Sequence, residues 1–77
     1  MVSAYILITT EVGSEDEVLE TIKRLPSVKS VSIVYGAYDL VAYVEAPSMD
    51  EIKRLVSNEI RKIEKIRSTL TMPVIEH

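Results

Sequence analysis

The spacing of apolar positions divides the chain into six elements of secondary structure. Four segments rich in β-branched and aromatic residues are short enough for strands. Two others repeat apolar residues every three to four positions, as amphipathic helices do. The expected strands are residues 2–10, 28–35, 39–46 and 66–75. One helix is expected between the first two strands and one between the last two, so the order is βαββαβ.

Both expected helices begin with the pattern Ser-x-x-Glu. Ser14 precedes Glu17 and Ser48 precedes Glu51, so each serine can cap its helix while the glutamate bonds back to the serine backbone. Pro26 ends the first helix. The apolar stripes are Val18, Leu19, Ile22 and Leu25 in the first helix, and Ile52, Leu55, Val56, Ile60 and Ile63 in the second.

Right-handed crossovers fold this order into one antiparallel sheet of four strands with both helices on one face. This is the ferredoxin-like α+β arrangement. Pro73 cannot donate to a strand ladder, so we expect the last strand at an edge of the sheet. A chain of 77 residues has room for one domain, which we assign to residues 1–77.

Two helices cover only one face of such a sheet, so the strand residues divide into two sets. We assign the more aliphatic set to the helix side: Ala4, Ile6, Ile8, Val31, Ile33, Leu40, Ala42, Val44, Leu70 and Met72. The open side then carries Tyr5, Leu7, Val34, Val41, Tyr43, Thr69 and Thr71. Monomers rarely expose so large an apolar patch. We therefore expect a two-fold dimer that packs sheet on sheet through Tyr5, Leu7, Val34, Val41 and Tyr43.

Composition removes several classes of function. The chain has no cysteine, which excludes disulfides and thiolate chemistry and is typical of a reducing cytoplasm. The formal charge of −3 opposes binding to a phosphate backbone, and no apolar run approaches the roughly 18 residues of a membrane span. His77 is the single histidine and the last residue, so no Ser/His/Asp set is possible. We expect no catalytic residue, no metal site and no cofactor.

The turn Gly36-Ala37-Tyr38-Asp39 is the remaining feature that invites explanation. A structural explanation is available: Gly36 gives the backbone freedom that the hairpin needs, Asp39 caps the turn, and Tyr38 covers an edge of the core. A functional explanation needs a ligand at the same turn, and residue types alone do not decide between the two.

Four segments resemble the RAM domain, the effector-binding half of the Lrp/AsnC transcription regulators. They are V-x-A-Y-I-L-I-x-T near the start, L-P-x-V before the second strand, G-x-Y-D-L-V-A at the hairpin and I-R-S-T-L-T at the last strand. The resemblance covers residues 1–77, and its most specific part is Gly36-Ala37-Tyr38-Asp39. It implies a βαββαβ domain that dimerises through its sheet as a dimeric α/β barrel. It further implies assembly into higher oligomers such as octamers, with amino acids bound between dimers.

The resemblance also implies a ligand site. Asp39 would accept from the ammonium group of an amino acid, and backbone N–H groups around Gly36 and Tyr38 would approach its carboxylate. Thr69 and Thr71 would offer hydroxyl groups. Because the chain begins at the first RAM strand, without the helix-turn-helix domain of those regulators, we expect a cytoplasmic ligand-binding module without direct contact to nucleic acid or membrane.

Three alternatives stay open. The chain could join full-length Lrp/AsnC regulators through the same sheet face, with no ligand of its own. It could be an ACT domain, which has the same strand order, although Glu11-Val12-Gly13-Ser14 is a poor match to the glycine-rich first loop of that domain. It could be an enzyme of the dimeric α/β-barrel type, but such enzymes need a base or a cofactor ligand that this chain lacks.

Overall fold

The structure, a computed structural model, describes residues 1–75, so that His77 lies outside the described residues. It contains four strands, two α-helices and a π-helical turn that continues the second helix. The elements are β1 (Val2–Thr10), α1 (Glu15–Ile22), β2 (Val28–Ile33), β3 (Leu40–Ala46), α2 (Met49–Leu55), η1 (Val56–Ile60) and β4 (Ile66–Pro73). The expected order βαββαβ is confirmed.

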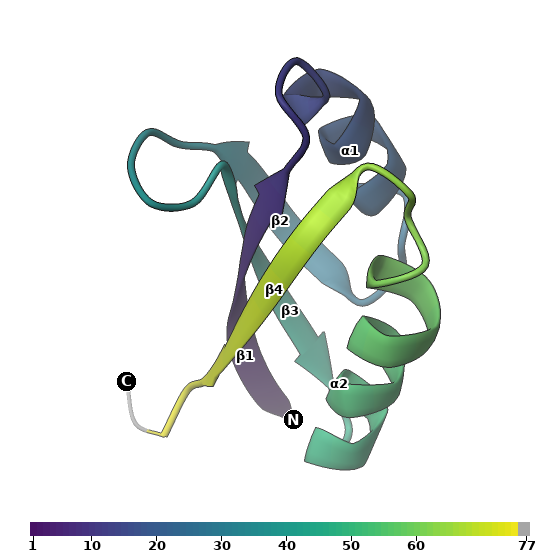
Figure 1. The fold of residues 1–77 in the computed structure, drawn as a ribbon. Coiled ribbons are helices and arrows are strands. Elements are labelled where there is room, and N and C mark those ends of the chain that lie inside the picture. The colour runs from purple at the N-terminus through teal and green to yellow at the C-terminus, as the bar shows by residue number, and fades with distance from the viewer. Residues whose placement is uncertain (76–77) are drawn as a thin grey trace.

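The four strands form one antiparallel sheet in the order β2-β3-β1-β4. Figure 1 shows α1 and α2 on the same side of this twisted sheet, while the opposite face carries no helix. The ferredoxin-like arrangement is therefore confirmed, and β4 lies at an edge of the sheet as Pro73 predicted. The β2–β3 loop projects from the end of the sheet at which β1 leads toward α1 and β4 begins (Figure 1).

The core lies between the helices and the two central strands. Residues paired across antiparallel strands share a face, and Ile6 lies opposite Ala42 while Ile8 lies opposite Leu40. The fully buried large side chains are Ile6, Ile8, Val18, Ile22, Leu40, Val44, Ile52 and Ile60. For β1 and β3, the predicted division between helix side and open side is correct.

For β4, the predicted division is wrong. Leu70 lies opposite Leu7 and Met72 lies opposite Tyr5, so both belong to the open face, where they are 45% and 43% exposed. The two threonines, Thr69 and Thr71, lie opposite Ile8 and Ile6 and therefore face the helix side. Both threonines are only partly buried there. An edge strand tolerates threonines on this side because the helices cover it incompletely.

For β2, the assignment holds in part. Register places Val31 and Ile33 on the helix side, opposite Ala42 and Leu40, and Val31 packs against the core. Ile33 is nevertheless 45% exposed, because it lies at the end of an edge strand. Val34 follows the end of β2 and is also exposed.

The expected serine cap is observed at one helix start out of two, and within residues 1–75 neither Glu17 nor Glu51 bonds back to the serine backbone. The Ser48 side chain accepts from the backbone N–H of Glu51 at 3.3 Å, as expected for a cap. Ser14 occupies the N-cap position of α1, but its side chain makes no capping bond. Its backbone N–H instead donates to the Glu11 carbonyl at 3.0 Å, within a turn that contains Gly13 at φ +84°. The start of α1 is therefore held by a backbone hydrogen bond of the preceding loop rather than by a capping box.

The β2–β3 loop requires glycine at position 36. Gly36 has φ +133°, a conformation that side chains with a Cβ rarely adopt, although an added Cβ would touch nothing within 4 Å. Gly36→Ala should therefore lower the free energy of unfolding by about 1–3 kcal/mol through backbone strain alone. Chemical denaturation measures this change. Ala37→Ser, at an exposed neighbour, is the control and should stay within about 0.5 kcal/mol. Equal stability of the two variants would contradict the role of Gly36.

Candidate functional site

Asp39 is held between the end of β1 and the β2–β3 loop. Its backbone N–H donates to the Ile8 carbonyl at 2.9 Å, and its carbonyl accepts from the Val34 N–H at 2.9 Å. Its Oδ2 atom accepts from the backbone N–H of Thr10 at 2.8 Å. The expectation that Asp39 caps its own turn is therefore wrong in detail. The carboxylate bonds to β1, because β1 and β3 are neighbours in the sheet.

Two open clefts meet at Asp39. The first, which we name the Arg67 cleft, has a volume of about 470 Å³. It is lined by Thr9, Thr10, Val12, Glu15, Asp39, Arg67 and Ser68. The second, which we name the Tyr35 cleft, has a volume of about 450 Å³ and is lined by Glu15, Asp16, Ile33, Val34, Tyr35 and Asp39. Glu15 and Asp39 line both clefts, so the two form one continuous region at this end of the sheet.

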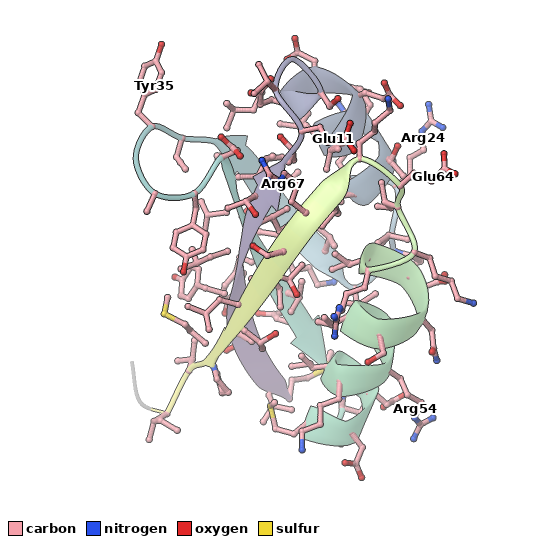
Figure 2. The ribbon with its side chains drawn as sticks, viewed as in Figure 1. Glu11, Arg24, Tyr35, Arg54, Glu64 and Arg67 are labelled. Atoms are coloured by element: carbon pink, nitrogen blue, oxygen red, sulfur yellow. The ribbon has the colours of Figure 1, made fainter. Side chains whose placement is uncertain are left out.

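Arg67 reaches the cleft from an irregular position in β4. Pairing with β1 passes from Thr9 opposite Ser68 directly to Thr10 opposite Ile66, so Arg67 is an extra residue without a partner on β1. Such a bulge turns a side chain away from the regular alternation of the strand. Figure 2 shows the Arg67 side chain over the end of β1, on the side of the β2–β3 loop.

The charges around the clefts do not neutralise one another by direct contact. Within residues 1–75, the single ion pair joins Lys23 Nζ and Glu20 Oε2, 3.2 Å apart. Arg67 lines the same cleft as Glu15 and Asp39, but its guanidinium does not come within 4.0 Å of either carboxylate. Thr9 and Ser68 add two hydroxyl groups that are hydrogen-bonded to each other. The cleft thus presents separated charges of both signs.

The structure brings together only part of the predicted ligand set. Gly36, Tyr38 and Asp39 lie in the β2–β3 loop or at its end, but only Asp39 lines a cleft. Thr69 and Thr71 lie on the helix side of β4, and Thr71 lines a different groove, between β4 and α2. The residues that do join Asp39 in the Arg67 cleft, and that sequence analysis missed, are Thr9, Thr10, Val12, Glu15, Arg67 and Ser68. Strand topology could have indicated these residues, since β1 ends where the antiparallel strand β4 begins.

The open face of the sheet is a second feature with functional meaning. Tyr5 and Tyr43 pack with ring centroids 5.1 Å apart and planes inclined by 51°, and the Tyr43 hydroxyl donates to Glu45 Oε2 at 3.3 Å. The face also carries Leu7, Val41, Leu70 and Met72. All six of these apolar residues belong to the central strand β1 or pair with it, so the patch is contiguous.

No helix within residues 1–75 is long and apolar enough to cross a membrane. The same residues contain no group of three or more His, Cys, Asp or Glu side chains arranged to hold a metal ion.

Comparison with known proteins identifies the family. The Lrp/AsnC ligand binding domain matches residues 3–77. An uncharacterized HTH-type transcriptional regulator of Pyrococcus horikoshii, PH1916, is 38% identical over 73 residues, which are 91% of this chain and 49% of that regulator. The chain spans about half the length of the curated relatives it matches.

Solved structures agree with this result. The hypothetical protein PHS023 from Pyrococcus horikoshii superposes with a TM-score of 0.92 at 39% identity, covering 100% of this chain and 93% of that one. AsnC of E. coli superposes with a TM-score of 0.93 at 25% identity, covering 99% of this chain and 52% of AsnC. The chain therefore belongs to the Lrp/AsnC ligand binding domain family, a regulatory domain of transcription regulators and not an enzyme.

Proposed function

We propose that this chain is an oligomeric regulatory module of the cytoplasm that binds an amino acid at Asp39. Proteins of the Lrp/AsnC family oligomerise and bind small-molecule ligands. The observation that supports the site is the orientation of the Asp39 carboxylate, which Thr10 holds at the junction of two clefts. A fixed carboxylate is suited to accept from an α-ammonium group, because charge-assisted hydrogen bonds are strong and directional.

The proposed assembly begins with a dimer formed through the open face of the sheet. Tyr5, Leu70 and Met72 are each more than two-fifths exposed in the single chain, beside Leu7 and Tyr43. A second copy packed sheet on sheet would cover this patch with two-fold symmetry. The proposed interface keeps Tyr5, Leu7, Val41 and Tyr43 from the set expected from the sequence, and it adds Leu70 and Met72. Val34 is left out, because it lines the Tyr35 cleft.

Higher oligomers, such as an octamer, would use the end of the molecule that carries Asp39. Val12 and Tyr35 are almost fully exposed there, one beside each cleft. Figure 2 shows Tyr35 projecting from the tip of the β2–β3 loop away from the body of the protein. Contacts between dimers through these two residues would close the clefts over a bound ligand and so connect ligand binding to assembly.

A thermal-shift screen with the twenty amino acids at millimolar concentration tests the proposed ligand class. An amino acid at about 100 times its dissociation constant should raise the free energy of unfolding by about 2.7 kcal/mol. Two kinds of control should give smaller shifts: the matching amines, which lack the α-carboxylate, and the matching carboxylic acids, which lack the α-ammonium. If no amino acid shifts the melting temperature, amino-acid binding is excluded.

A second candidate function is joining full-length regulators without a ligand. Relatives such as PH1916 are about twice as long as this chain and match it over one half. A regulator of that kind would present the same apolar sheet face, so mixed dimers with this chain could form. Mixing the two proteins and looking for co-elution during size-exclusion chromatography tests this function. Regulation would then act through assembly rather than through direct contact of this chain with DNA. The net charge of −3 disfavours such contact, because the DNA backbone is also negative.

A further inference from the structure

We infer that the two clefts together select a basic amino acid, one whose side chain ends in a second cation. In this arrangement Arg67 binds the α-carboxylate, Asp39 binds the α-ammonium, and Glu15 with Asp16 binds the cationic end of the side chain. The inference rests on the proposed function, because it takes Asp39 as the ammonium site. It extends that function by naming the class of amino acid and three residues that no resemblance assigned.

The role of Arg67 follows from the bulge in β4. A regular strand would pair residue 67 with β1 and continue the alternation of faces. The bulge leaves Arg67 unpaired and places it in the cleft with Asp39. Its planar guanidinium can hold a carboxylate through two parallel hydrogen bonds. No carboxylate within residues 1–75 lies within 4.0 Å of it, so this capacity is open to a ligand.

Asp39 lies where the two clefts meet, so it can bind the ammonium group from which the carboxylate and the side chain of an amino acid extend in different directions. It lines both clefts, so a ligand whose ammonium lies at Asp39 can extend its carboxylate into the Arg67 cleft and its side chain into the Tyr35 cleft. One Asp39 oxygen is already fixed by the Thr10 N–H at 2.8 Å, which sets the direction of the carboxylate. The three groups on the Cα of the ligand thereby receive separate partners.

The lining of the Tyr35 cleft indicates the chemistry of the side chain. Ile33, Val34 and Tyr35 offer apolar surface for a methylene stem, while Glu15 and Asp16 offer two carboxylates. Long basic side chains pack their stems on apolar surface and keep the charged end among polar groups. Glu15, Asp16 and Asp39 carry three negative charges against the single positive charge of Arg67. That balance favours a ligand with two cations and one carboxylate and opposes an acidic one.

The acids at the start of α1 also have a structural explanation. Carboxylates in the first turn of a helix interact favourably with its dipole, and Glu15, Asp16 and Glu17 all share this position. Only Glu15 and Asp16 line a cleft, however, whereas Glu17 lines neither. Glu17→Gln is therefore a control that removes one negative charge from the same turn without touching the proposed site.

Calorimetric titration with L-lysine and L-norleucine provides the main test. Norleucine keeps the α-groups and the aliphatic stem but lacks the second ammonium. Lysine should bind at least about tenfold more tightly, since a hydrogen bond to a charged group contributes that much or more. Glutamate should bind more weakly than either. If norleucine, leucine or glutamate binds as tightly as lysine and arginine, the selectivity for basic amino acids is overturned while the proposed function stands. If no amino acid binds, both proposals fail.

Variants assign the two roles separately. The double change Glu15→Gln and Asp16→Asn should reduce the affinity ratio of lysine to norleucine to near one, while Glu17→Gln should leave it unchanged. Arg67→Gln should weaken both ligands about tenfold or more and leave the ratio intact, because the lost contact is to the shared carboxylate. Arg54→Gln, on the exposed side of α2 (Figure 2), is its control and should change neither affinity. An unchanged ratio in the double variant, or full affinity in Arg67→Gln, would overturn the corresponding assignment.

Discussion

Replacing Tyr43 by aspartate is expected to abolish dimer formation. The Tyr43 ring packs against Tyr5 on the open face, and Met72 lies on the other side of Tyr5. In a sheet-on-sheet dimer, an aspartate there would be buried without a partner, at a cost of several kcal/mol. Size-exclusion chromatography with light scattering at micromolar concentration should therefore show monomers or aggregates. A variant that remains a dimer with an unchanged melting temperature would refute the open face as the interface.

Two further variants separate assembly from folding. Leu70 is 45% exposed in the single chain, so Leu70→Asp should leave the monomer folded while preventing its dimerisation. Tyr35→Asp makes the same chemical change as Tyr43→Asp, but at a fully exposed residue in the β2–β3 loop. This control should keep the dimer. Circular dichroism verifies that each variant retains its secondary structure.

The central strands are the part of the fold that the sequence predicts best. β1 and β3 alternate aliphatic residues on one side with tyrosine, leucine and valine on the other, and register confirms this division. Both strands are central in the sheet, and both sides of each are apolar. The two tyrosines, Tyr5 and Tyr43, fall on the same side, and this difference from the wholly aliphatic side was enough to assign the faces.

The edge strand β4 shows where this kind of argument fails. Its two sides carry Leu70 and Met72 against Thr69 and Thr71, and placing the more apolar pair on the helices was the natural choice. The opposite arrangement is observed, because the open face is itself apolar and continues across Leu7 and Tyr5 onto β4. The register of a strand is decided by its pairing, and a shift of one residue exchanges its faces.

Of the residues that line the candidate site, only Asp39 was predicted from the sequence. The G-x-Y-D pattern indicated Asp39, but its carboxylate bonds to Thr10, which is 29 positions away along the chain. Arg67 enters through a bulge that leaves no mark in the spacing of apolar residues. Clefts assembled from the end of β1, the start of β4 and the start of α1 depend on tertiary arrangement. Strand order could have indicated which segments meet, although not which side chains point into the cleft.

Asp39 has both a structural and a proposed binding role, and the two can be separated by choice of substitution. Thr10 is buried, so removing the acceptor of its N–H in Asp39→Ala should cost about 1–3 kcal/mol of stability. The amide oxygen of Asp39→Asn can still accept this bond, so that variant should keep its fold and its melting temperature. Asn is also common in turns.

Asp39→Asn should nevertheless weaken binding of the best amino acid from the screen by roughly 1.5–3 kcal/mol, because the hydrogen bond to its ammonium loses the charge of the acceptor. Exposure of the cleft to solvent places the expected value toward the lower end of this range. Calorimetric titration of both proteins measures the difference, and a ligand analogue without the α-ammonium should bind the two equally weakly. Equal affinity of Asp39→Asn and the unchanged protein for the amino acid would mean that Asp39 has only a structural role, through its bond to Thr10. The ammonium site would then have to lie elsewhere in the clefts.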